Sequence, residues 1–190
     1  VLIVDDSRSS LAFLASIIAD IGDVEIETCL SPSKALARSE TIQFDLVLVD
    51  YVMPEMNGVD LTGRLRSREP YRLVPIIMIT SDDDRELRLD AIGAGATDFL
   101  NKPFDPTELR ARVRNLLALR QAQTDLSNHA RWLAREVENA TRHLVEREEE
   151  VIWRLARAIE YRDGDTGNHV SRVAQISRLI AEGIGLSAER

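Results

Sequence analysis

The chain has 190 residues, of which 44% are hydrophobic, and a formal net charge of −8. This length allows one large domain or one domain with an appendage, and the composition is sufficient for a hydrophobic core. No apolar run approaches the roughly 18 residues that span a bilayer, so we expect a soluble cytoplasmic protein without a membrane segment. The acidic balance argues against binding to nucleic acid.

The acidic charge lies mainly in the first part of the chain. Residues 1–119 carry 13 Lys and Arg against 20 Asp and Glu, whereas residues 120–190 carry 11 against 12. Neither part has the basic excess that a DNA-binding domain needs. The chain starts at Val1, inside an expected strand, and Ser187 near its end resembles the N-cap of a helix that does not follow. We therefore expect a fragment of a longer protein.

Short apolar segments alternate with helix-length amphipathic segments from residue 1 to about residue 118. The expected strands are VLIV, VEIETC, FDLVLVD, VPIIMIT and TDFLNKPF, at residues 1–4, 24–29, 44–50, 74–80 and 97–104. Continuous apolar strands separated by helices indicate a parallel sheet that is covered on both faces. The sequence therefore predicts a doubly wound α/β domain of five βα repeats over residues 1–118.

A long helix is predicted to follow the last strand. The segment Asp105-Pro106-Thr107-Glu108 combines an N-cap residue, a proline at the first helical position and an early acidic residue. No glycine or proline interrupts residues 107–163. The helix is therefore expected to continue far beyond the α/β domain.

Apolar residues recur along this helix with alternating steps of three and four residues, as in the seam of a coiled coil. Nine of the eleven seam positions are apolar, and the full set is Leu116, Leu119, Gln123, Leu126, Ala130, Leu133, Val137, Ala140, Leu144, Arg147 and Val151. Gln123 and Arg147 would set the register of the two chains. We predict a coiled-coil dimerisation linker at residues 119–151, with parallel chains, followed by the start of an all-helical domain at residues 152–190. A helix lying on its own domain is the alternative.

Polar residues end four of the expected strands. Asp5 and Asp6 follow the first strand, Asp50 ends the third, Thr80 ends the fourth, and Lys102 follows the apolar part of the fifth. In an open parallel sheet, ligands bind outside the carboxyl ends of the strands. Three carboxylates there form a hard oxygen site of the kind that Mg²⁺ takes. A lysine and a threonine hydroxyl would bind the oxygens of a phosphoryl group while one carboxylate attacks phosphorus.

Residues 1–118 resemble the receiver domains of two-component response regulators. The resemblance rests on the spacings of 45 residues from Asp5 to Asp50, 30 to Thr80 and 22 to Lys102, and on the segments VDYVMPEMNG and NKPF. It implies a flavodoxin-like sheet with strand order 2-1-3-4-5. It also implies a histidine kinase as the partner that supplies the phosphoryl group.

The resemblance assigns roles to single residues. It implies that Asp50 accepts the phosphoryl group and that Asp6 and Asp50 bind Mg²⁺ directly. Asp5 would bind the metal mainly through water, and Val52 through its backbone carbonyl.

The same resemblance implies that Lys102 and Thr80 contact the phosphoryl group. Phe99 would act with Thr80 as a switch residue that reports phosphorylation. The Lys102–Pro103 peptide bond is expected to be cis.

The segment AIEYRDGDTGNHVSRVA, within residues 152–190, is similar to the opening of the HD-GYP phosphodiesterase domain. Members of that family hydrolyse cyclic di-GMP at a di- or trinuclear metal centre of iron or manganese. The resemblance implies that Asp165 and His169 supply the first metal ligands, although glutamate is more usual at the position of Asp165. The adjacent His-Asp pair and the Gly-Tyr-Pro segment of the family are absent from this chain. We therefore expect no complete output-domain metal site here.

Two functions stay open from the sequence. The first is a regulator in which the coiled coil relays phosphorylation of Asp50 to a cyclic di-GMP phosphodiesterase domain, completed only in a longer protein. The second is a non-catalytic, phosphorylation-dependent dimerisation or scaffold module that binds partner proteins. A His-Asp pair followed by a Gly-Tyr-Pro segment in the longer protein would favour the first.

Overall fold

The computed structural model describes residues 1–81, 85–162 and 169–183, and within them all side chains except those of residues 85–88, 159–162, 169–171 and 183. The chain divides into two units, Val1–Ser127 and Asn128–Arg190. None of the helices in the described ranges is both long and apolar enough to cross a bilayer.

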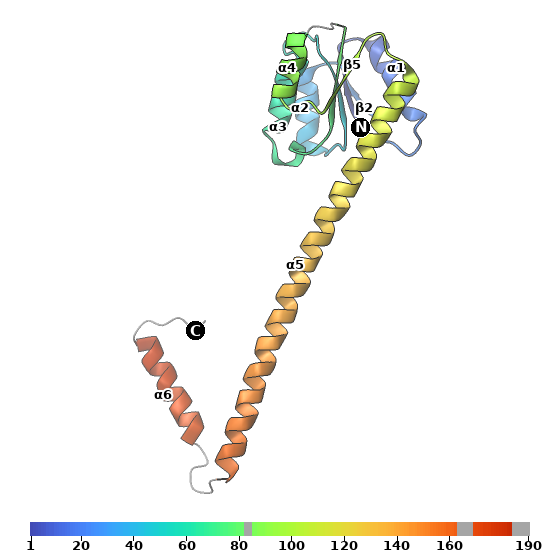
Figure 1. Ribbon diagram of the computed structural model, residues 1–190. Coiled ribbons are helices and arrows are strands. Elements are labelled where there is room, and N and C mark those ends of the chain that lie inside the picture. Colours follow the sequence, from blue (N-terminus) through green and yellow to red (C-terminus); the bar gives the residue numbers. More distant parts are fainter. Residues whose placement is uncertain (82–84, 163–168, 184–190) are drawn as a thin grey trace. The chain divides into compact units, whose positions relative to one another are not determined.

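The first unit contains a parallel sheet of five strands in the order β2-β1-β3-β4-β5 (Figure 1). The strands are β1 (Leu2–Val4), β2 (Glu27–Cys29), β3 (Val47–Asp50), β4 (Ile76–Thr80) and β5 (Asp98–Asn101). The predicted strand order is confirmed, but the strands are shorter than the apolar segments suggested. The largest difference is at β5, where four residues replace the predicted eight, and at β2 three residues replace the predicted six. Both are edge strands, so each pairs with a single neighbour.

Helices connect the strands and cover both faces of the sheet. They are α1 (Arg8–Ala19), α2 (Pro32–Thr41), α3 (Gly58–Arg66), the short 3₁₀ helix η1 (Glu69–Tyr71), α4 (Arg85–Gly93), α5 (Pro106–Arg162) and α6 (His169–Gly183). The Ser7 and Ser31 side chains cap α1 and α2 by accepting backbone N–H groups. Proline occupies the first position of α2.

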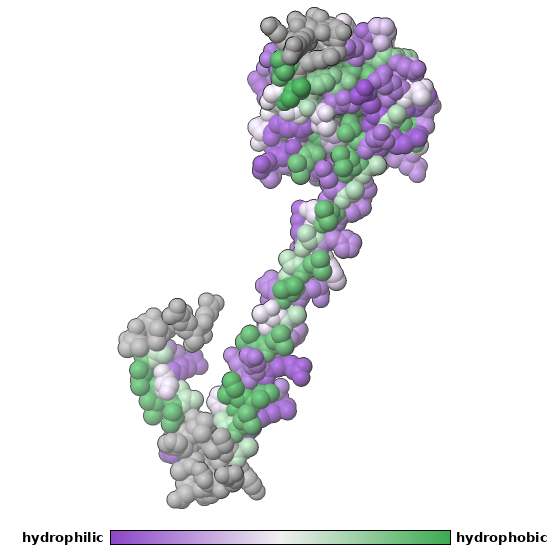
Figure 2. Space-filling view, in the orientation of Figure 1, coloured by the Kyte–Doolittle hydropathy of each residue, from purple (hydrophilic) through white to green (hydrophobic). Residues whose placement is uncertain are grey.

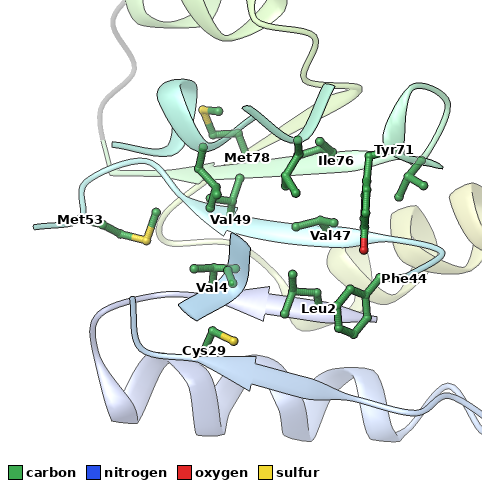
Figure 3. Packing of buried hydrophobic residues seen from close by; sticks show 14 of the residues in the cluster. Leu2, Val4, Cys29, Phe44, Val47, Val49, Met53, Tyr71, Ile76 and Met78 are labelled. Carbon is green, nitrogen blue, oxygen red and sulfur yellow. The ribbon is translucent and has the colours of Figure 1, made fainter. Parts of the chain in front are cut away.

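Alternate residues of each central strand enter two separate cores. Val47 and Val49 of β3 pack with apolar residues of α2, α3 and α4, in the cluster that Figure 3 shows. Leu48 of the same strand packs on the other face, with apolar residues of α1 and of the first turns of α5. The sheet is therefore buried on both sides, which explains its continuous apolar strands and leaves the strand ends as its accessible polar edge.

Helix α5 is continuous from Pro106 to Arg162, so the prediction of one long uninterrupted helix is confirmed. At its start, Asp105 accepts a hydrogen bond of 2.6 Å from the Thr107 N–H. Leu109 and Val113 are fully buried against the sheet, and Leu116 packs partly against the same core. Leu116, the first residue of the predicted seam, therefore packs on the α/β domain of its own chain.

The remaining large apolar residues of the predicted seam are exposed. Leu119, Leu126, Leu133, Val137, Leu144 and Val151 are each 54–73% exposed, and Figure 2 shows apolar surface recurring along α5. In α6, the apolar residues Val173, Ile176, Leu179 and Ile180 are also exposed. Coiled-coil pairing and the domain boundaries at residues 118 and 151 stay predictions.

Candidate functional site

Four strand ends meet at one edge of the sheet. β3 ends at Asp50 and β4 ends at Thr80, while Asp5 follows β1 and Lys102 follows β5 directly. Because β1, β3, β4 and β5 are neighbours in a parallel sheet, these residues share its carboxyl edge. The structure therefore brings together the strand-end residues that the sequence suggested as one site.

The Lys102 ammonium joins two buried carboxylates. Its Nζ lies 2.5 Å from Asp50 Oδ1 and 3.4 Å from Asp5 Oδ2. Asp5 is 1% exposed and Asp50 is 7% exposed, so the three charges meet largely out of water. The second oxygen of each carboxylate accepts a backbone N–H, from Val52 at 3.0 Å for Asp50 and from Ser7 at 2.8 Å for Asp5. Both carboxylates are thus held in fixed orientations.

Burial and charge act against each other in this cluster. Burial raises the pKa of Asp50, while the hydrogen bond and the positive charge of Lys102 lower it, and the net pKa stays above the usual value. For Lys102, burial lowers the pKa, but the contacts with Asp50 and Asp5 outweigh it and the net pKa is raised. The two carboxylates share one ammonium, so the cluster keeps a negative charge that a cation would neutralise.

A close backbone approach next to Asp50 requires glycine at position 58. A Cβ atom on Gly58 would lie 2.5 Å from the Asp50 carbonyl oxygen, closer than side chains tolerate. The Gly58 N–H donates to the Tyr51 carbonyl at 2.9 Å, and the Asn57 side chain caps α3 by accepting the Asp60 N–H. No role was predicted for Gly58, although the Asn-Gly pair that ends VDYVMPEMNG is a turn signal that could have indicated one.

The other predicted site residues differ in exposure. Asp6 is exposed although its neighbour Asp5 is buried. Val52 is 67% exposed, and its backbone N–H donates a hydrogen bond to Asp50. Thr80 is 6% exposed, and Phe99 is partly buried against the core on the α2–α4 side. Among the described residues, no group of three or more His, Cys, Asp or Glu side chains is arranged to hold a metal ion. Magnesium binding stays a prediction.

An aromatic pair, in which Phe13 is exposed and Phe104 is partly buried, lies next to the lysine. The Lys102–Pro103 peptide bond is cis, as predicted. Phe104 stacks on Phe13 of α1 with ring centroids 6.2 Å apart, and Phe13 is 49% exposed. A cavity of about 260 Å³ is lined by Ser10, Phe13, Leu14, Lys102, Pro103 and Phe104. This small apolar surface, which we call the Phe13–Phe104 patch, offers a contact site beside the buried charges.

The predicted output-domain ligands are not tested by the structure. Asp165 lies outside the described residues. His169 is the first residue of α6, but its side chain is also outside the described part of the chain.

Residues 1–114 match the family model of the response regulator receiver domain. Among solved structures, the chemotaxis protein CheY4 of Vibrio cholerae is 32% identical and aligns with a TM-score of 0.58, covering 60% of this chain and 95% of that one. The receiver domain of DrrB, activated by BeF₃, is 27% identical, with a TM-score of 0.56 over 62% of this chain and 95% of that one.

Two curated relatives are similar over almost the whole chain. The cyclic di-GMP phosphodiesterase response regulator RpfG of Xanthomonas campestris is 42% identical over 100% of this chain and 50% of its own length. A probable cyclic di-GMP phosphodiesterase of Vibrio cholerae is 30% identical over 96% of this chain and 41% of its own length. The chain therefore spans about half the length of these relatives.

Proposed function

The chain belongs to the response regulator receiver family, and on this basis we propose that a histidine kinase phosphorylates it on Asp50. The observation that carries the proposal is the position of Asp50, which lies at the end of β3 with its carboxylate held by Lys102 and by the Val52 N–H. An oriented, ionised carboxylate is a competent nucleophile toward phosphorus.

In the proposed step, a carboxylate oxygen of Asp50 attacks the phosphorus atom of a phosphohistidine. The phosphorus–nitrogen bond breaks, its electron pair stays on the imidazole, and an acyl phosphate forms on Asp50. The Lys102 ammonium lies 2.5 Å from Asp50 Oδ1, where it would offset the negative charge that develops on the phosphoryl oxygens during the transfer. The Thr80 hydroxyl, at the adjacent strand end, would bind a phosphoryl oxygen, and Phe99 would respond to that contact.

We propose Mg²⁺ as the cofactor of this site, held by Asp5, Asp6, Asp50 and the Val52 carbonyl. The chemistry of the donors fits, because all four ligands would be hard oxygens. In this structure the Lys102 ammonium lies between the two buried carboxylates and Asp6 is exposed, so the described side chains are not arranged as a metal shell. When bound, Mg²⁺ supplies charge neutralisation for the incoming phosphoryl oxygens.

Intact-mass measurement after incubation with acetyl phosphate and Mg²⁺ tests the assignment of Asp50. We expect one phosphoryl group on the wild-type chain, one on the control variant Asp60→Asn, and none on Asp50→Asn. Asp60 is a suitable control because it is an exposed carboxylate on the neighbouring helix α3. A phosphoryl group on Asp50→Asn would contradict the assignment.

We further propose that the protein works as a homodimer joined through α5. Six large apolar seam residues are more than half exposed in the single chain, and a stripe of this kind is unusual for a monomer. A parallel pair would present two output domains at the same end of the coil. Transfer from a histidine kinase would place the dimer in the cytoplasm, where ATP is available.

The proposed output is hydrolysis of cyclic di-GMP by an HD-GYP domain in a longer protein. Similarity to cyclic di-GMP phosphodiesterases along the whole chain supports this output and disfavours the non-catalytic scaffold. In the complete domain, Asp165 and His169 would supply the first ligands of an iron or manganese centre.

A further inference from the structure

The last third of helix α5 departs from the seven-residue pattern of the predicted coil. If the alternating steps of three and four continued past Leu144, Arg147 and Arg154 would both occupy seam positions. The Arg154 side chain is 76% exposed and is paired within its own helix, 2.5 Å from Glu150. Two guanidinium groups per chain in an apolar interface would be costly to bury.

A shift of one residue after Leu144 brings apolar residues into the seam instead. The pattern Val137, Ala140, Thr141, Leu144 repeats eleven residues later as Glu148, Val151, Ile152, Leu155, and Ile159 begins the next repeat. Seven of these nine positions are apolar. The described large residues Val151, Ile152 and Leu155 are each 54–65% exposed, so the single chain leaves them without cover.

The residues beside the seam change at the same point. One position beside the seam recurs every seven residues. Before residue 145 it is occupied by the polar residues Thr124, Arg131 and Glu138. From residue 145 onward it is occupied by Val145 and Ile152, both at least half exposed. An eleven-residue repeat corresponds to about 3.67 residues per turn, so apolar residues on this side are drawn into the interface as the pairing geometry changes.

We infer that the seam changes from a seven-residue to an eleven-residue repeat at Leu144 and that a second copy of this chain covers it through Leu155. This inference rests on the proposed dimer. Arg147 and Arg154 then face solvent, and Glu148 is the one charged residue that enters the pattern. The dimer interface extends beyond residue 151, into the helical domain predicted at residues 152–190.

The area of the stripe favours a second copy as the partner. Leu119, Leu126, Leu133, Val137, Leu144, Val151 and Leu155 lie along one side of α5 and are each more than half exposed. At about 100 Å² each, they supply roughly 700 Å² per chain before their neighbours are counted, close to the roughly 800 Å² per partner of a standard interface. Identical stripes in a parallel pair meet residue by residue, so each chain covers the other over the whole length.

Disulfide formation between the two chains of the dimer, compared at neighbouring positions of α5, tests the repeat change. Single cysteines are introduced at Arg147, Glu148, Arg154 and Leu155 in a Cys29→Ser background of the 190-residue chain, with Leu126→Cys as the seam control. A disulfide needs Cβ atoms about 4 Å apart, so we expect Glu148→Cys and Leu155→Cys to cross-link at least about tenfold faster than Arg147→Cys and Arg154→Cys. Leu126→Cys should cross-link as fast as Leu155→Cys.

The possible outcomes separate this inference from the dimer proposal. Faster cross-linking at residues 147 and 154 than at 148 and 155 would show an unchanged heptad repeat and overturn the inference alone. Cross-linking at residue 126 but at none of the four test positions would show that the helices separate before residue 147, which also overturns it. No cross-linking at residue 126 would overturn the dimer itself.

Discussion

Asp5 and Asp6 are adjacent in the sequence but have different roles in the fold. Asp5 directly follows β1 at the sheet edge, where it is buried and contacts Lys102, whereas Asp6 is exposed.

The buried charges of Lys102 and Asp50 have opposite effects on the stability of the fold as pH changes. Because the pKa of Lys102 is raised in the folded state, its protonation stabilises the fold. This stabilisation is fully present below the pKa of Lys102 in the unfolded chain and is lost as pH rises through the folded pKa. The raised pKa of Asp50 makes its ionisation destabilising, so that stability falls as pH rises from the unfolded pKa of that carboxyl.

Replacement of Lys102 by methionine should raise the pKa of Asp50 further. Burial of Asp50 would persist, while the hydrogen bond and charge that lower its pKa would be lost. The measurement is a titration of the Asp50 carboxyl carbon by NMR, without divalent cations. Lys34→Met is the control, because Lys34 is exposed on α2. An Asp50 pKa that is unchanged or lower in Lys102→Met would contradict the electrostatic account of the site.

The side chain at position 52 should affect the lifetime of the acyl phosphate. Val52 is two residues after Asp50 and is 67% exposed, but its side chain has no polar group that could orient a hydrolytic water. We expect Val52→Asn to speed dephosphorylation roughly tenfold, a modest effect beside the 10²–10⁴-fold of full general acid–base catalysis. The Val52 N–H bond to Asp50 is retained, so the fold should persist. Phosphoprotein decay is compared with Val52→Ala, and equal decay rates for both variants would argue against this role.

At the scale of elements, the apolar runs predicted five strands, because a sheet buried on both sides requires such runs, whereas the strand order was predicted from the resemblance to receiver domains. The sequence overestimated the length of β2, since pairing at a sheet edge depends on a neighbour that local pattern does not reveal. The polar side chains of the site were predicted from their positions at the strand ends, and their individual roles from the resemblance to receiver domains. The contribution of Ser7 was missed, because it arises from a backbone N–H whose position only the tertiary fold determines. The Asn-Gly turn signal could have indicated a role for Gly58, but not the close approach to the Asp50 carbonyl that requires glycine there.

The Phe13–Phe104 patch joins helix α1 to the segment after β5 and lies beside Lys102. A kinase domain that delivers a phosphoryl group to Asp50 must approach this edge of the sheet. We expect Phe13→Asp to slow phosphorylation by the histidine kinase at least about tenfold, as loss of an aromatic anchor costs about 2 kcal/mol or more at an interface. Phosphorylation by acetyl phosphate should be unchanged. An equal slowing with both donors would show damage to the site instead.

The α5 seam makes a second prediction at this scale. Leu126→Glu combined with Leu133→Glu should dissociate the proposed dimer, raising its Kd by at least about 100-fold, since each lost core leucine costs about 2–5 kcal/mol. Light scattering or sedimentation gives the measurement. The matched control is Asn128→Glu with Arg135→Glu, which adds charge on the opposite side of the same turns and should leave the dimer intact. A wild-type chain that is monomeric at micromolar concentration would remove the basis for this prediction.

On the scale of the whole molecule, helix α5 belongs to both units. Its first turns are packed into the receiver domain through Leu109 and Val113, and the same helix runs without a break to Arg162, which precedes Asp165 and His169 in the sequence. This continuity is the physical reason to expect that phosphorylation of Asp50 affects an output domain so distant in sequence.

The 190-residue chain should have no cyclic di-GMP phosphodiesterase activity, whereas the longer protein should have it. A bridged metal centre needs several His and Asp ligands from different helices, and a metal-activated water forms only in a complete ligand shell. This chain supplies at most Asp165 and His169, so any metal bound there should be removed easily by chelators. Hydrolysis assays of both proteins, with added iron or manganese, provide the measurement. Turnover by the 190-residue chain would overturn this assignment of domains. An inactive longer protein, tested across metals and phosphorylation states, would favour the scaffold function.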